Sequence, residues 1–122
     1  MAVIMFASEF AEKVRSGEKR RTIRQREIKV GEKLSLREWS GGKAYEMGSH
    51  HVSILETTCL HSSVVQIYRT KTSLVIKVGM VPLTSSERKA FIEKDGFETL
   101  RDFENWFSSL YGLPFYGWLT EW

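Results

Sequence analysis

The first apolar positions of the chain form a strand-length run that is followed by a helical pattern. The run Val3–Phe6 is typical of a short buried strand. Phe10 and Val14 lie four residues apart, so they share one face of a predicted helix. Ser8 is expected at the N-cap of this helix, and Gly17 is expected just after its end, where a left-handed conformation is needed.

The middle of the chain predicts strands. Val, Ile, Thr and Tyr are frequent between residues 50 and 78, and β-branched residues favour strand over helix. Gly41 and Gly42 interrupt the preceding alternation of polar and apolar residues and predict a hairpin loop at 40–43. The extended segments expected on this basis are 22–24, 34–37, 50–60, 63–69 and 73–78.

Two helices and a closing strand are predicted for the last third of the chain. Thr84 and Glu87 have capping-box spacing, which starts a helix that ends near Gly96. Thr99 or Glu98 caps a second helix, and segment 115–122 returns as a strand. The second helix carries an apolar stripe that is expected to face the core, made of Leu100, Phe103, Trp106, Phe107 and Leu110.

The order of these elements predicts a single α+β domain over residues 1–122. A strand, a helix and another strand are followed by a β-rich middle, two helices and a final strand. We expect this chain to form a small mixed β-barrel with flanking helices.

Positive charge is concentrated near the N-terminus. Residues 13–33 contain nine basic and three acidic side chains, a local net charge of +6, whereas the whole chain carries only +3. A confined basic patch on a slightly acidic body is typical of proteins that bind phosphates. The alternative interpretation is that the basic run is an ordinary solvated face.

Cysteine content and hydropathy indicate the compartment. The single cysteine, Cys59, excludes an internal disulfide and fits a reducing environment. The apolar start of the chain is too short for a signal peptide, and no window approaches the ~20 apolar residues of a membrane span. We therefore expect a soluble, cytoplasmic protein.

Histidine and cysteine side chains do not predict a metal site. His50 and His51 are adjacent, so on a strand they point to opposite faces. Cys59 and His61 share a face, but two ligands do not make a zinc site. The chain also lacks a Gly-rich phosphate loop and a dinucleotide-binding fingerprint, so no metal and no cofactor is expected.

The pattern Gly-x-Lys-x-x-Thr-x-Arg at residues 17–24 resembles the signature of the ASCH domain, a small β-barrel domain related to the PUA RNA-binding fold. Two further blocks resemble the same family. One is the turn at 29–34, and the other is Asp-Gly-Phe at 95–97 followed by Trp-Phe at 106–107. Together these blocks span most of the chain.

The resemblance implies a PUA-like barrel with a cleft between the strands and the helices, and the basic motif would form the floor of this cleft. Members of the family are associated with RNA binding, some resemble amidohydrolases that remove the acyl group from N4-acetylcytidine, and others are connected with RNA cleavage. By motif position, Lys19 and Thr22 would match the lysine and threonine of the amidohydrolases, and Arg24 would match their adjacent arginine. The glutamate of those enzymes corresponds here to Asp95, with Glu93 two residues earlier.

An amide hydrolase needs a nucleophile, a base that activates it and donors for the developing oxyanion. Thr22 could attack if Lys19 were neutral enough to take its proton. A lysine normally titrates near ~10.4, so burial or cationic neighbours must lower its pKa. Either Asp95 or Glu93 could then position water or protonate the leaving amine, and the sequence leaves this choice open.

RNA or nucleoside binding does not need a shifted pKa and is our first hypothesis. The hydrolase is the alternative. Trp39, Tyr45 or Trp118 could stack on a base. A third class is a protein-interaction module whose basic face meets an acidic partner. The oligomeric state is left open. The side chains expected to bind the nucleic acid are Lys19, Arg20, Arg21, Arg24, Arg26 and Trp39.

Overall fold

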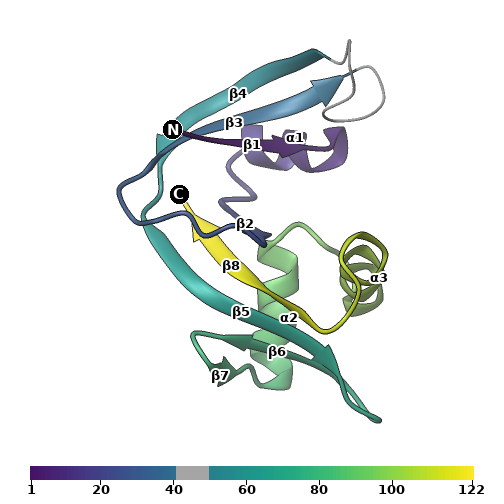
Figure 1. Cartoon of the computed structure of the whole chain (residues 1–122). Helices are drawn as coiled ribbons and strands as arrows, with labels where there is room; N and C mark the ends of the chain where they lie inside the picture. The colour runs from purple at the N-terminus through teal and green to yellow at the C-terminus, as the bar shows by residue number, and fades with distance from the viewer. Residues whose placement is uncertain (41–49) are drawn as a thin grey trace.

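Strands and helices follow one another along residues 1–40 and 50–122, which are the residues described in this computed structural model (Figure 1). Residues 41–43 of the hairpin loop predicted at 40–43 lie outside them, as does Tyr45, whereas Ser40 is described as part of a strand. The described part has eight strands and three helices: β1 (Ala2–Phe6), α1 (Ser8–Arg15), β2 (Arg21–Arg24), β3 (Lys33–Ser40), β4 (His50–Thr58), β5 (His61–Arg69), β6 (Leu74–Val78), β7 (Val81–Pro82), α2 (Ser85–Lys94), α3 (Leu100–Leu110) and β8 (Phe115–Glu121).

The described strands form two sheets. One has the order β1-β3-β4, with β1 parallel to β3, and the other has the order β2-β8-β5-β6-β7 and is antiparallel throughout. The α+β class is therefore as predicted, but the strands do not close into the barrel that the sequence analysis expected. Figure 1 shows the smaller sheet above the larger one, with the helices beside them.

The chain passes from one sheet to the other at Cys59 and Leu60, between β4 and β5. The Cys59 N–H donates to the carbonyl of Glu32, 2.9 Å away, beside the first sheet. The next N–H, that of Leu60, donates to the carbonyl of Glu121, 2.8 Å away, in the second sheet. The chain therefore leaves the first sheet at Cys59 and joins the second at Leu60.

Capping residues set the helix boundaries. The capping box of α2 is confirmed, since Thr84 accepts from the Glu87 N–H and Glu87 accepts from the Thr84 N–H. Thr99 caps α3 by accepting from the Asp102 N–H. At α1 the prediction was wrong by one residue, because the N-cap is Ala7, which has no side-chain acceptor.

Aromatic rings pack the space between α1 and α3. The Phe10 and Phe97 ring centroids are 5.3 Å apart, as are those of Phe97 and Phe103, and Phe103 lies 4.7 Å from Phe107. The predicted stripe on α3 is thus core at Phe103 and Phe107, whereas Leu110 at its outer end is 58% exposed. Among the described residues, no helix is long and apolar enough to cross a membrane.

Candidate functional site

A buried ion pair joins the start of the basic run to the end of α2. Lys19 Nζ lies 3.0 Å from Asp95 Oδ1 and also donates to the Asp95 backbone carbonyl at 2.5 Å. Both side chains are only 4% exposed. Local structure brings Lys19 here, because Gly17 adopts a positive φ of 81° after the helix and turns the chain so that the Lys19 N–H bonds to the Lys13 carbonyl.

Asp95 is the acid that faces the lysine, and this decides a choice that the sequence left open. Asp95 is the C-cap of α2 and is buried, whereas Glu93, two residues earlier, is exposed. Successive helical residues are about 100° apart, so Glu93 and Asp95 point to nearly opposite sides of the helix end. Of the two predicted acids, the structure brings only Asp95 to Lys19.

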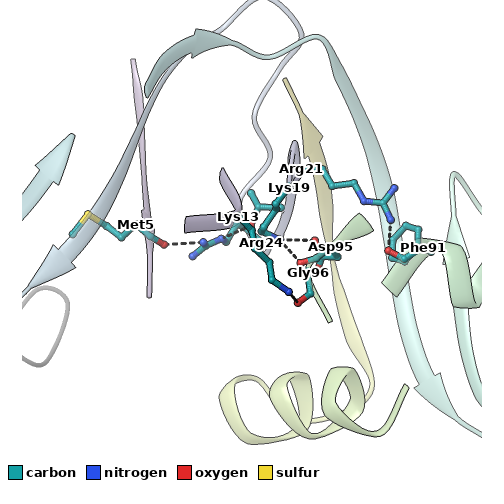
Figure 2. Close-up of polar contacts among 9 residues, drawn as sticks. Met5, Lys13, Lys19, Arg21, Arg24, Phe91, Asp95 and Gly96 are labelled. Atoms are coloured by element: carbon teal, nitrogen blue, oxygen red, sulfur yellow. Dashed lines mark hydrogen bonds and ion pairs between the residues drawn. The ribbon is translucent and has the colours of Figure 1, made fainter. Parts of the chain in front are cut away.

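Three cations cap the C-terminal end of α2 (Figure 2). Lys13 Nζ donates to the Gly96 carbonyl at 2.8 Å, Lys19 donates to the Asp95 carbonyl, and Arg21 donates to the Phe91 carbonyl. Carbonyls at the C-terminal end of a helix carry the negative end of the helix dipole, which stabilises nearby cations. The Phe91 carbonyl also accepts from the Asp95 N–H. Part of the basic run therefore has a structural role.

Burial lowers the pKa of Lys19 and of Arg21. Desolvation lowers the pKa of Lys19, which is opposed by Asp95 and assisted by the positive charges of Arg24 and Arg21. Desolvation also lowers the pKa of Arg21. Lys19 is therefore easier to deprotonate than an exposed lysine, which is what a general base requires.

Thr22 and Arg24 lie on one face of β2. Arg24 Nε donates to Thr22 Oγ1 at 3.1 Å. Arg24 Nη2 donates to the Met5 carbonyl at 2.8 Å (Figure 2). The bond from Arg24 uses a lone pair of the Thr22 oxygen and leaves the hydroxyl proton for another acceptor. Arg24 thereby fixes the threonine and connects β2 to β1.

These four side chains share one small pocket. Lys19, Thr22, Arg24 and Asp95 line a cavity of about 40 Å³ that also touches Ile23. This is little more than the ~30 Å³ that one molecule occupies in liquid water. The cavity can admit a small chemical group but not a whole nucleoside. The aromatic and aliphatic side chains that complete its wall are Phe6, Phe10, Phe97, Trp106, Phe107, Leu110 and Tyr111.

A larger groove adjoins the pocket. Its volume is about 560 Å³, within the ~300–1,000 Å³ that is usual for ligand pockets. Phe10, Phe97, Trp106 and Leu110 line both spaces. Sequence analysis missed this groove, although the apolar stripe ending at Leu110 contained a signal for it. The groove's other lining residues are Glu9, Lys13, Gly96, Glu98, Asp102, Asn105 and Ser109.

The remaining predicted binding residues lie apart from the pocket. Arg20 is exposed, and its Nε donates to the Trp122 carbonyl at 3.1 Å. Arg21 has its guanidinium carbon 4.1 Å from the centroid of the Phe91 ring. Arg26 is exposed, while Trp39, on β3 in the other sheet, is half-buried. None of these four is among the residues that line the pocket.

The predicted absence of a metal site concerns Cys59 and its histidine neighbours. Among the side chains that the structure describes, which do not include those of His50 and His51, no group of three or more His, Cys, Asp or Glu is placed to hold a metal ion. Burial raises the pKa of Cys59, and its Sγ donates to the His61 carbonyl at 3.4 Å. Because the thiolate is the form that binds a metal ion, the raised pKa makes Cys59 a poor metal ligand.

Comparison with known proteins adds no relative. No protein-family model matches the chain, and neither the curated proteins nor the solved structures contain a match. The ASCH resemblance therefore stays a prediction from the motif.

Proposed function

We propose that this protein is an amidohydrolase of the ASCH type with a PUA-like fold, acting on N-acylated nucleoside-type compounds. One observation carries the proposal: a pocket sized for a small group, lined by Lys19, Thr22 and Asp95, adjoins a groove sized for a ligand. An acyl group fits the pocket, and the amine part of the substrate fits the groove. Lys19, Thr22 and Arg24 of the motif share this pocket, as a common chemical role requires.

Acyl transfer to Thr22 is the first half of the reaction. Thr22 Oγ1 attacks the acyl carbon while its proton passes to neutral Lys19 Nζ. The tetrahedral intermediate then breaks its C–N bond, and the Lys19 ammonium gives the proton to the leaving nitrogen. Asp95 holds Lys19 through the two bonds to its carboxylate and carbonyl.

Hydrolysis of the Thr22 ester completes the reaction. Lys19, neutral again, takes a proton from water as the water oxygen attacks the acyl carbon. The ester C–O bond breaks, the proton returns to Thr22 Oγ1, and a carboxylic acid leaves. The protein is thereby restored with no other reactant than water.

We assign the stabilisation of the oxyanion to two groups. The first is the positive charge of Arg24, whose Nε donates to Thr22 Oγ1. The second is the Ile23 N–H. The Trp122 N–H donates to the Arg20 carbonyl at 3.0 Å, which makes these two residues a hydrogen-bonded pair. Hydrogen-bonded and non-hydrogen-bonded pairs alternate along antiparallel strands. Ile23 is three residues after Arg20, so it belongs to a non-hydrogen-bonded pair, and its N–H and C=O point away from β8. These groups therefore face the outer edge of β2, and Ile23 lines the pocket.

RNA binding is the second candidate function, and the exposure of Arg20 and Arg26 favours it. Arg20 and Arg26 lie at the surface, where a phosphate can reach them, although each has a partner in the protein, the Trp122 carbonyl for Arg20 and the Glu32 carboxylate for Arg26. Lys19, in contrast, is buried and bonded to Asp95. Binding of this kind would weaken steeply with salt, with a log–log slope of about −0.7 per phosphate contacted on a single strand. Loss of that slope in an Arg20→Ala/Arg26→Ala variant would support it.

Turnover of N4-acetylcytidine by the purified protein, followed by ultraviolet absorbance, tests the hydrolase. We expect hydrolysis that Lys19→Ala and Thr22→Val abolish and Thr22→Ser retains in part. The matched control is Thr120→Val, because Thr120 lies opposite Thr22 on β8 but does not line the pocket. Wild-type turnover by Thr22→Val would exclude threonine as the nucleophile, and no turnover by folded wild-type protein would contradict the function for this substrate.

A further inference from the structure

The groove beside the pocket is acidic, in contrast to the basic run at residues 13–33. Its lining contains the carboxylates of Glu9, Glu98 and Asp102 and a single ammonium, that of Lys13. The net charge of these four groups is −2. The Lys13 ammonium already donates to the Gly96 carbonyl, so it is held at one wall of the groove.

The pocket has no such excess of negative charge. With Lys19 neutral, as the hydrolysis requires, the positive charge of Arg24 balances the negative charge of Asp95, and a protonated Lys19 makes the pocket net positive. A ligand that spans both spaces meets the positive charge of Arg24 at the pocket and a net negative charge in the groove. The pocket therefore suits the oxygen of an acyl group, whereas the groove repels an anion through the Coulomb term.

Aromatic walls in the groove suit a flat ring. Trp106 is half-buried, and its ring centroid lies 5.0 Å from that of Phe10 and 6.0 Å from that of Phe97. Packing against two other rings fixes the indole while leaving part of it accessible. Near this wall, Glu98 and Asp102 can only accept hydrogen bonds when ionised, so they favour a ligand with hydroxyl or amino donors.

We propose that this groove selects phosphate-free ligands: an aromatic base bearing a hydroxylated sugar or another donor-rich group, and not the corresponding nucleotide or an RNA strand. The inference rests on the proposed function, because it names the substrate class of the same site. On this inference the acidic groove, and not the basic run, sets the ligand preference of the site. A phosphate on the sugar would face Glu98 and Asp102 instead of arginines.

Calorimetric titration with cytidine and with cytidine 5′-monophosphate at low ionic strength tests the selection. We expect cytidine to bind roughly tenfold more tightly than the monophosphate. In a Glu98→Gln/Asp102→Asn variant the difference should shrink, chiefly because the monophosphate binds better. A Glu27→Gln/Glu56→Gln variant removes the same charge from exposed positions that do not line the groove, and there the difference should remain.

The outcomes separate this inference from the proposed function. Equal or tighter binding of the monophosphate, binding of neither probe, or an unchanged preference in the Glu98→Gln/Asp102→Asn variant would overturn the selection. A preserved cytidine preference without hydrolysis of N4-acetylcytidine would support the selection and contradict the amidohydrolase. Hydrolysis with equal use of the phosphorylated substrate would overturn the selection alone.

Discussion

Lys19 and Asp95, 76 residues apart in the chain, form a buried ion pair with 3.0 Å between Nζ and Oδ1. Two consequences follow from the same geometry. The pair holds the turn after α1 against the end of α2, and it places a lysine with a lowered pKa in the pocket that Thr22 also lines. Structural and chemical roles therefore need separate experiments.

Removing one member of the buried pair should destabilise the fold strongly. Lys19→Met or Asp95→Asn alone should lower the free energy of unfolding by about 3–5 kcal/mol, because the remaining charge loses its partner in a desolvated site. The Lys19→Met/Asp95→Asn double variant should lose much less than the sum of the two single changes. Urea denaturation of the four proteins measures this coupling.

The exposed pair of Arg69 and Glu104 is the control for that cycle. Its Nη1–Oε1 distance is 3.2 Å, but the arginine side chain is 52% exposed. Exposed pairs couple by about 0.2–1 kcal/mol, so the same cycle on this pair should give a small value. Equal coupling at the two pairs would show that burial does not set the strength of the Lys19–Asp95 interaction.

The rate of amide hydrolysis should rise with pH. Lys19 accepts a proton only when neutral, and its pKa is lowered from the ordinary value of 10.5. The profile of kcat/KM should therefore increase through a midpoint below that value. A rate that is flat up to the ordinary lysine pKa would contradict Lys19 as the base.

The free energy of unfolding should also depend on pH through the lowered pKa of Lys19. Between the lowered pKa in the fold and the ordinary pKa in the unfolded chain, the unfolded chain holds more protons, so the free energy of unfolding rises with pH. Below the lowered pKa both states are protonated at Lys19, and its contribution no longer changes. Denaturation at a series of pH values should show this rise in the wild type and not in Lys19→Met.

Gly96 is a position where a side chain should disturb the site. It has a φ of +99°, and an added Cβ would lie 3.1 Å from Phe10 Cδ1 and 3.5 Å from Lys19 Cδ. Gly112 has a φ of +79° with no atom within 4 Å of an added Cβ, so Gly112→Ala measures backbone strain alone. Thermal or urea unfolding should find Gly96→Ala less stable by a further 1–3 kcal/mol, roughly the cost of overpacking. Equal losses would show that Phe10 moves aside without cost.

Local elements could be predicted from the sequence because their signals are local. The capping box of Thr84 and Glu87 and the cap at Thr99 set two helix starts that the structure confirms. The strand β7 was missed, since Val81 and Pro82 give too short a run for a period to show. The separation into two sheets was missed as well, because it depends on which strands pair, and pairs such as β2 with β8 join segments far apart in the sequence.

The candidate site could be predicted from the sequence only in part. The motif brought attention to Lys19, Thr22 and Arg24, and all three line the pocket. A run of basic residues ordinarily predicts a solvated face, so the burial of Lys19 against the end of α2 had no local signal. The acidic groove depends on how α1 and α3 pack around Phe97, and periodicity within one helix cannot reveal a space between two.

Arg24 should matter to both stability and activity, because it connects the two sheets and holds Thr22. Arg24→Gln removes the charged donor to the Met5 carbonyl and to Thr22 Oγ1, which should cost about 1.5–3 kcal/mol in urea denaturation. Arg26→Gln is the matched control. The Arg26 side chain is 65% exposed and its Nη2 lies 3.7 Å from Glu32 Oε2, so its replacement should change stability by less than about 0.5 kcal/mol.

Hydrolysis by the same two variants tests the catalytic part of the role of Arg24. Because Arg24 Nε bonds to the attacking oxygen, Arg24→Gln should lower kcat more than it raises KM, while Arg26→Gln should leave both near the wild type. An Arg24→Gln protein that is destabilised but hydrolyses N4-acetylcytidine with an unchanged kcat would restrict Arg24 to a structural role. The oxyanion would then depend on the Ile23 N–H at the outer edge of β2, which Arg24→Gln leaves in place.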